Sequence, residues 1–288
     1  MIAKGFIGFF SRTPLRFNQG LGKLLGHLVW KLAKRERCIA LRNLELCFPE
    51  KTEDWRNQKA RESLQAMMMA LLESPRIWSS TSDELEKYLD NRHVLDEILE
   101  VYAQGRGLVI ATPHLGSWEY VGQLLAQHVT MTNLFRPPRM HGLTETIIKG
   151  RGASGANIVP TNSRGIRALS QALNRGECTG ILPDQEPEKG HGIFAEFFSR
   201  PAYTMMLLPR FVKKRRTPVI FLFAERRSSG RFRFIHQWAN EEIYDDDPAV
   251  ACQMMNQQLE YLIRCCPSQY NWAYKRFKTQ PTGQNPYR

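Results

Sequence analysis

The chain of 288 residues lacks several patterns that mark particular classes of protein. Its six cysteines include no Cys-x-x-Cys pair and no zinc-type spacing, and Cys265 and Cys266 are adjacent. We therefore expect free thiols in a reducing compartment rather than a disulfide framework. No grouping of histidines and acids has metal-ligand spacing, so neither a metal nor another cofactor is expected.

The sequence also lacks internal repeats, low-complexity tracts and a Ser/Gly/Pro-rich linker. No secretory signal is evident, because the apolar stretch at residues 5–10 is short and no small-residue cleavage site follows it. With 42% hydrophobic residues, the chain can bury a full core in one large domain. We expect a distinct N-terminal segment, residues 1–36, followed by a single domain over residues 37–288.

Positive charge is concentrated near the start of the chain. The formal net charge is +12, and residues 1–42 hold nine Lys/Arg but only one acid, Glu36. Such asymmetry points to an anionic partner: a membrane, a nucleic acid or an acidic protein. A second basic cluster lies at residues 210–216 and contains no aromatic residue from Lys213 to Arg216, which argues against nucleic acid.

Apolar residues between positions 21 and 32 recur at helical spacing, with basic residues mostly on the other side. The apolar set is Leu21, Leu24, Leu25, Leu28, Val29 and Leu32. This pattern predicts an amphipathic basic helix that is too charged to span a bilayer. It favours contact with an anionic membrane surface, and the alternative is a core-packing helix with a solvated basic face.

Farther along, the hydrophobic pattern changes from long helices to an alternation of short strands and helices. Helical patterns cover residues 52–80 and 83–103. Strands are expected at Leu108–Ala111, Met131–Phe135, Ile158–Val159, Thr179–Leu182, Val219–Ala224 and Phe232–His236, and helices near 141–154, 163–174, 203–213 and 248–265. This order predicts an α/β fold with a mixed, largely parallel central sheet, helices on both faces and a preceding helical region.

The most informative stretch follows the first of these strands. Thr112-Pro113 ends the strand, Ser117 is placed as a helix N-cap, and His114 lies in the turn between them. Glu119 falls in the first helical turn, where its carboxylate could hold one imidazole nitrogen while the other faces a cleft. That arrangement makes histidine a general base. The alternative is a turn histidine beside a solvated glutamate, and the spacing alone does not decide between them.

The His114-x-x-x-x-Glu119 spacing resembles the signature of glycerolipid-type acyltransferases. Four further stretches, in order along the chain, resemble the bacterial late acyltransferases of lipid A assembly, the lauroyl/myristoyl transferase family. They are residues 42–50 (RNLELCFPE), 149–151 (KGR), 182–185 (LPDQ), and 269–272 (QYNW) with 276–279 (RFKT). The likeness covers nearly the whole chain and makes residues 37–288 an expected acyltransferase domain.

The resemblance assigns roles to individual residues. It implies that His114 is the general base, that Glu119 orients it, and that Asp184 belongs to the site. Arg151 stands thirty-two residues after Glu119, where the family has an essential arginine, and is expected to bind an anionic substrate group or steady the oxyanion. By itself, Arg151 reads as a cation at a helix C-terminus.

Other arginines are candidates for binding the substrate. Arg136 and Arg139 lie in a loop stiffened by Pro137-Pro138 and could clamp phosphate, and Arg164 is a further candidate. His114, Asp184 and the segment 134–139 each follow a predicted strand. If those strands are parallel, the three features meet at one edge of the sheet, where ligands of open α/β sheets collect.

The implied reaction is transfer of a fatty acyl chain from an acyl carrier protein thioester to a hydroxyl of a lipid A precursor of the Kdo2-lipid IV(A) type, in lipopolysaccharide biosynthesis. Transfer is direct, and the backbone N–H groups of Gly116 and Ser117, with Arg151, are expected to bind the oxyanion. The expected location is the cytoplasmic face of the bacterial inner membrane. Family members usually carry one N-terminal spanning segment, and this chain either departs from that pattern or has the segment truncated.

Two other functions fit parts of the sequence. A lysophospholipid acyltransferase would share the chemistry, but the Glu-Gly-Thr-Arg-like block usual in such enzymes is not found. A non-catalytic basic membrane-binding protein would explain the charge, but it would leave the pairing of His114 with Glu119 and its strand-end neighbours unexplained.

Overall fold

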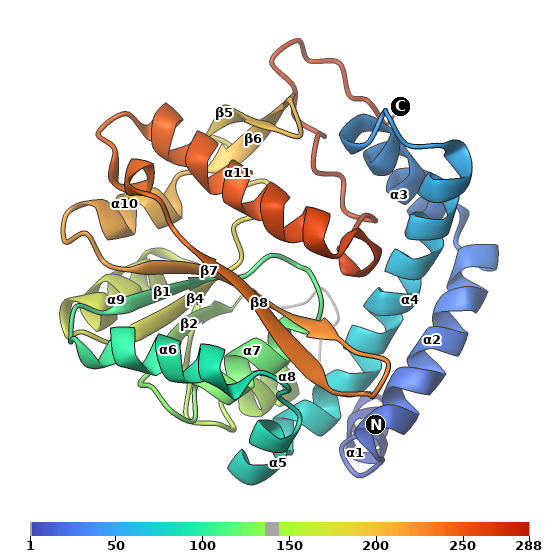
Figure 1. The fold of residues 1–288 in the computed structure, drawn as a ribbon, viewed down its shortest axis with the longest axis horizontal. Helices are drawn as coiled ribbons and strands as arrows, with labels where there is room; N and C mark the ends of the chain where they lie inside the picture. Colours follow the sequence, from blue (N-terminus) through green and yellow to red (C-terminus); the bar gives the residue numbers. More distant parts are fainter. Residues whose placement is uncertain (1, 136–143, 288) are drawn as a thin grey trace.

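A computed structural model describes residues 2–135 and 144–287, and their arrangement is drawn in Figure 1. The N-terminal region is helical: α1 (Ile2–Phe10), α2 (Leu15–Leu32), α3 (Lys34–Cys47) and α4 (Glu53–Trp78). α5 (Ser82–Lys87) and α6 (Arg92–Ala103) lead to the sheet. The long α4 begins where the side chain of Thr52 accepts the N–H of Trp55, as an N-cap does.

The central sheet has the strand order β4-β1-β7-β8. Its strands are β1 (Leu108–Ala111), β4 (Cys178–Ile181), β7 (Val219–Arg226) and β8 (Phe232–Trp238). β1 is parallel to both β4 and β7, and β8 is antiparallel to β7. A parallel pair, β2 (Thr132–Phe135) and β3 (Asn157–Pro160), lies beside β4 through a parallel bridge between Met131 and Cys178. The carboxyl ends of β1, β2 and β4 therefore meet at one edge.

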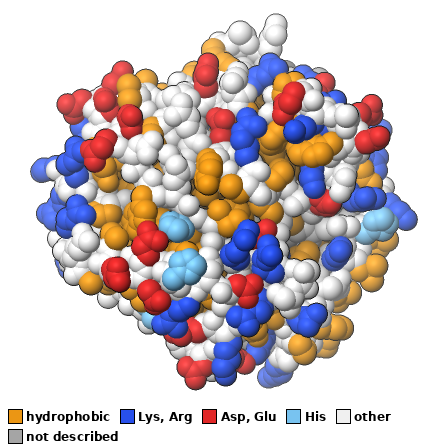
Figure 2. All heavy atoms as spheres, viewed as in Figure 1, with side chains coloured by type: hydrophobic (Ala, Val, Ile, Leu, Met, Phe, Trp, Pro, Cys, Tyr) orange, Lys and Arg blue, Asp and Glu red, His pale blue; other side chains and the backbone are white. Residues whose placement is uncertain are grey.

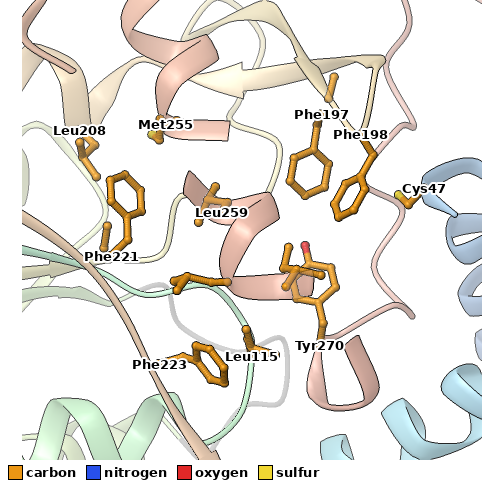
Figure 3. Close-up of a cluster of buried hydrophobic side chains, with 14 of the residues drawn as sticks. Cys47, Leu115, Phe197, Phe198, Leu208, Phe221, Phe223, Met255, Leu259 and Tyr270 are labelled. Carbon is orange, nitrogen blue, oxygen red and sulfur yellow. The ribbon is translucent and has the colours of Figure 1, made fainter. Parts of the chain in front are cut away.

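Alternating residues of the sheet belong to two separate cores. Val109, Phe221 and Phe223 point into a cluster with α11 (Pro248–Cys265) and α10 (Leu207–Lys213), part of which is drawn in Figure 3. Ile110 and Ile220 point the other way, against α6 and α7 (Trp118–Leu125). Helices thus cover both faces, with α11 and α6 on opposite sides in Figure 1, and the predicted fold class is confirmed.

The remaining elements are α8 (Thr144–Arg151), α9 (Ser163–Asn174) and a hairpin of β5 (Gly192–Phe197) and β6 (Arg200–Met205). The expected helix near 203–213 was wrong in its first residues. Residues 200–205 pair with β5 instead, and α10 begins only at Leu207. The predicted helices near 163–174 and 248–265 are confirmed as α9 and α11.

Helix α2 packs on α4 mainly through Leu15 and through small and polar residues. A Cβ added at Gly22 would lie 2.6 Å from Met69 Cα, and one at Gly26 would lie 2.3 Å from Gln65 Cα, so the two backbones touch. Next to them the buried Gln19 donates to Glu73, whose carboxylate also accepts Arg226 of β7 at 2.8 Å. Leu24, Leu28 and Leu32, on another side of α2, are left exposed.

Candidate active site

The loop that carries His114 is held by its backbone. Gly116 has a φ of +59°, and a Cβ there would lie 2.1 Å from the carbonyl oxygen of Ala224, so the loop can approach β7 only because this residue is glycine. The 269–271 segment binds the other side: Gly116 N–H donates to Gln269 O at 3.2 Å, and Asn271 N–H donates to His114 O at 2.9 Å.

Leu115 anchors the same loop in the core. It is fully buried and lies near Phe223 and Tyr270 in Figure 3. Burying such a side chain stabilises a fold by about 1.5–3 kcal/mol. The segment 269–272 is in turn held by Asn43, whose side-chain amide donates to Trp272 O at 2.6 Å. Two of the family-like stretches of the sequence therefore meet behind the His114 loop.

The carboxylate that binds the imidazole of His114 is that of Asp184. Asp184 Oδ1 lies 2.8 Å from His114 Nδ1, and its Oδ2 accepts the backbone N–H of His114 at 3.0 Å. Burial alone would raise the pKa of Asp184, but its interactions with His114 hold that pKa below the usual value. An ionised carboxylate only accepts hydrogen bonds, so Nδ1 carries the proton and Nε2 carries a lone pair.

The expected bond between Glu119 and His114 was wrong. Glu119 lies in the first turn of α7, where its carboxylate accepts Arg151 Nε at 3.0 Å and Trp78 Nε1 at 2.9 Å. Arg151 Nη2 adds a further bond to the same carboxylate. Burial would raise the pKa of Glu119, but the charge and hydrogen bonds of Arg151 keep it low, and Glu119 in turn raises the pKa of Arg151.

Close packing between α8 and α4 brings Arg151 to this position. A Cβ at Gly150 would lie 2.6 Å from the ring of Trp78, so the glycine allows α8 to rest on that ring. Gln123 of α7 then donates to the carbonyl of Arg151 at 2.8 Å. The Lys149-Gly150-Arg151 motif thus places a guanidinium on Glu119 rather than capping a helix in solvent.

The expected oxyanion donors are already in use. The N–H of Ser117 donates to Ala224 O at 2.9 Å, and that of Gly116 is bound to Gln269, so the backbone expectation was wrong. Ser117 is the N-cap residue of α7 as predicted, although its side chain makes no capping bond. Within the described residues, Gln185 is a side-chain donor close to the imidazole, and its Nε2 lies 3.3 Å from His114 Nε2 and 3.4 Å from Nδ1. Because these distances are nearly equal, the amide lies over the ring face.

His114 opens into a cavity of about 530 Å³. The polar lining consists of Thr112, His114, Glu119, Gln123, Asn133, Arg151, Thr161, Gln185, Glu186 and Glu188. The apolar lining consists mainly of Ile110, Trp118, Val121, Met131, Leu134, Ile158, Ile181, Leu182, Met205 and Leu207. A volume of this size with a few convergent polar groups is typical of small-ligand sites.

The other predicted site residues are placed as follows. Arg136 and Arg139 lie outside the described residues. Arg164 is exposed in the first turn of α9, three residues after Thr161, which lines the cavity. Within 2–135 and 144–287, no group of His, Cys, Asp or Glu could hold a metal ion. The same part of the chain contains six free cysteines.

Sequence reasoning missed two residues of the site. Trp78, at the end of α4, gave no signal because its contact with Glu119 depends on tertiary packing. Gln185 follows Asp184 within a family-like stretch, and that position was the available signal.

Together these features define a class of protein: an α/β enzyme whose histidine–carboxylate pair, at the carboxyl edge of the sheet, faces a largely apolar cavity. Comparison with known sequences makes the class specific. Residues 3–279 match the family described as bacterial lipid A biosynthesis acyltransferase. The chain therefore belongs to this family, and it is an acyltransferase.

Several relatives are similar over most of their length. The lipid A biosynthesis palmitoleoyltransferase of Escherichia coli (strain K12) is 28% identical, with 98% of this chain and 91% of the relative covered. The lipid A biosynthesis lauroyltransferase of the same organism is 24% identical, covering 94% and 87%. Its lipid A biosynthesis myristoyltransferase is 25% identical, covering 96% and 86%. These relatives differ in the acyl chain that their names give.

Proposed function

We propose that this enzyme transfers a fatty acyl chain from an acyl carrier protein thioester to a hydroxyl of a lipid A precursor of the Kdo2-lipid IV(A) type. The observation that carries the proposal is the 2.8 Å contact between Asp184 and His114, which lines a cavity with many apolar residues. A base with an unprotonated Nε2 suits an alcohol nucleophile, and an apolar cavity suits an alkyl chain.

The chemistry follows from the tautomer. His114 Nε2 removes the proton of the acceptor hydroxyl while its oxygen attacks the thioester carbonyl, forming the new C–O bond. The C–S bond then breaks, and the protonated imidazole returns its proton to the leaving thiolate. Asp184 holds Nδ1–H and stabilises the imidazolium between the two steps. General base catalysis of this kind contributes about 10²–10⁴ in rate.

The tetrahedral oxyanion needs a donor from a side chain, because Gly116 and Ser117 use their N–H groups within the fold. Gln185 is our candidate, since its amide lies beside Nε2 and it lines the cavity. Arg151 also lines the cavity. Its guanidinium pairs with Glu119, which holds it in place at the cavity. Its proposed role there is to bind an anionic group of the acceptor or to assist Gln185.

The N-terminal helices provide a surface suited to an anionic membrane. Large apolar side chains of α1, α2 and α4 are exposed: Phe6, Phe9, Phe17, Leu24, Leu28, Leu32 and Leu71. The basic residues Lys23, Lys31, Lys34 and Arg35 are exposed with them. In Figure 2, apolar and basic side chains occur together along the edge where Figure 1 places α1 and α2. No helix of the described residues is long and apolar enough to cross a bilayer.

This surface supports residues 1–36 as the membrane-associating segment and the cytoplasmic face of the inner membrane as the place of reaction. Apolar contacts would reach the acyl boundary while lysine and arginine meet lipid headgroups. An acidic carrier protein also suits the net charge of +12.

The test is direct. Purified protein is incubated with acyl carrier protein thioesters and a tetra-acylated lipid A precursor, and product masses are measured. A mass increase of one acyl chain, lost in His114→Ala, is the expected result. Acylation of a lysophospholipid but not of the lipid A precursor would instead support a lysophospholipid acyltransferase. Transfer by the His114→Ala variant would overturn the mechanism.

A further inference from the structure

Gly122 occupies an unusual position for a glycine. It lies in the middle of α7 (Trp118–Leu125), where glycine is less favourable than alanine by roughly 0.8–1.0 kcal/mol. Neither close packing nor backbone conformation requires it there. Its φ is not positive, and a Cβ added to it would meet nothing within 4 Å. The open space in front of Gly122 belongs to the cavity, which this residue lines.

The position of Gly122 along the cavity follows from helix geometry. Gly122 is one turn after Trp118, hence about 6 Å farther along the helix axis. The ring centroids of Trp118 and His114 lie 5.4 Å apart, so Trp118 lies next to the imidazole. On the sheet, both Thr112 and Ile110 line the cavity, and Ile110 lies two residues farther from the carboxyl end of β1. Helix and strand therefore agree that the cavity extends from His114 past Trp118 to Gly122 and Ile110.

We propose that Gly122 is a specificity-determining residue that leaves room for the distal part of the acyl chain. The proposal rests on the function given above and adds the part of the site that selects chain length. Any side chain at position 122 would enter space that the far methylene groups of a long chain require. Short chains would end before that point and would be unaffected.

A side chain at position 122 should therefore raise the stability of the protein and lower its activity with long acyl chains. An added methyl at position 122 removes the glycine penalty in the helix, so the protein should become more stable. The same methyl would crowd a long alkyl chain, and overpacking of this kind costs about 1–3 kcal/mol, equivalent to roughly 5–150-fold in kcat/KM. A purely structural glycine would show the opposite sign, with alanine lowering stability.

The experiment compares Gly122→Ala and Gly122→Leu with wild type, using an equimolar series of saturated acyl carrier protein thioesters from medium to long. Gly20→Ala is the matched control, because Gly20 is an exposed glycine inside α2 whose added Cβ also meets nothing within 4 Å. The products are measured by mass in competition, and Tm is measured for each variant.

Gly122→Ala should lower use of the longest accepted chain about tenfold and leave the shortest within about twofold, with Gly122→Leu shifting the profile further. Both alanine variants should raise Tm by about 1–4 °C. An unchanged length profile, or an equal loss at every length, would overturn the proposal.

A second measurement separates this proposal from the proposed reaction. His114→Ala protein with and without Gly122→Leu is titrated with non-hydrolysable acyl thioethers of graded length. Weaker binding of long chains alone supports the role of Gly122 even if the wild type transfers no acyl group, which would refute only the reaction. Equal binding at every length overturns the role of Gly122.

Discussion

The imidazole of His114 is bound by a carboxylate seventy residues farther along the chain, with 2.8 Å between His114 Nδ1 and Asp184 Oδ1. Adjacent parallel strands bring the two together, because β1 and β4 end at the same edge in register Ala111 with Ile181. The same aspartate also accepts the backbone N–H of His114. Ring orientation and loop position therefore depend on one buried group.

Replacing Asp184 by asparagine should disable His114 without unfolding the protein. An amide can donate to Nδ1, which would favour the tautomer with its proton on Nε2, and we expect turnover to fall by about 10³–10⁴. Because the pair acts as one unit, His114→Ala with Asp184→Asn should be little worse than the worse single variant. Transfer kinetics of the four proteins check this, with the exposed Asp96→Asn as the control. Additive losses would show that the residues act independently.

Removing the Gln185 amide should lower the rate of the chemical step. We expect Gln185→Ala and Gln185→Glu to reduce kcat by roughly 10²–10³ with KM little changed, as for loss of one oxyanion donor. Transfer and acceptor-free thioester hydrolysis should fall together, since both pass through a tetrahedral intermediate. Near-normal kcat in both variants would leave Gln185 as a neighbour of the imidazole only.

Arg151 is expected to matter more for the acceptor than for the thioester. Arg151→Ala should impair transfer more than Arg151→Lys, because lysine keeps a charge but loses the two-point contact with Glu119. Both variants should impair transfer more than hydrolysis. Parallel loss of the two activities would instead assign Arg151 to the oxyanion, and equal activity of all three proteins would make it structural.

The pair of Glu119 with Arg151 should give stability a defined pH dependence. The pKa of Glu119 is lowered in the fold, so its contribution is fully present above the unfolded carboxyl pKa of about 4.3 and is lost as pH falls through the lower folded value. Urea unfolding should show Arg151→Ala less stable by about 1–3 kcal/mol at neutral pH, with the gap narrowing in acid below about pH 4. The exposed Arg167→Ala should show no such gap, and a gap that widens in acid would contradict the assignment.

The exposed leucines of α2 should control membrane association. Replacing Leu24, Leu28 and Leu32 by glutamine should reduce co-sedimentation with anionic vesicles while the fold is kept, because these side chains are exposed. Added salt should weaken the binding of wild type. Val250→Gln with Tyr261→Gln, exposed on α11, is the control. Deleting residues 1–36 is a less selective test, since it also removes Gln19 from the buried Glu73. Unchanged binding by the triple variant would refute this role.

Much of the fold could be predicted because it depends on local patterns. The strand before His114 and the helices α9 and α11 follow from apolar periodicity and turn residues. The hairpin of β5 and β6 could not, because residues 203–213 also fit a helical pattern and the pairing of residues 200–205 with β5 is a tertiary contact. The convergence of His114 with Asp184 was predictable from the rule that parallel strands end at one edge.

The partner of His114 was not predictable from spacing. Whether Glu119 or Asp184 reaches Nδ1 depends on the rotation of α7, which is fixed by contacts with Trp78 and Arg151 from distant parts of the chain. The side of α2 that faces the rest of the protein was also not predictable from the sequence. Its leucines suggested the buried side of a helix or a membrane face, and only the contact of Gly22 with α4 decides which side is covered.

The backbone contact between α2 and α4 has a geometrical consequence. Because α2 and α4 touch at Gly22 and Gly26, they cannot slide or separate without breaking the buried hydrogen bond between Gln19 and Glu73. α2 is therefore fixed to the rest of the fold. α4 ends at Trp78, beside Glu119. If α2 lies on the lipid surface, the distance of His114 from the bilayer is fixed by the protein. Only acceptor hydroxyls at that distance from the bilayer can then reach the histidine.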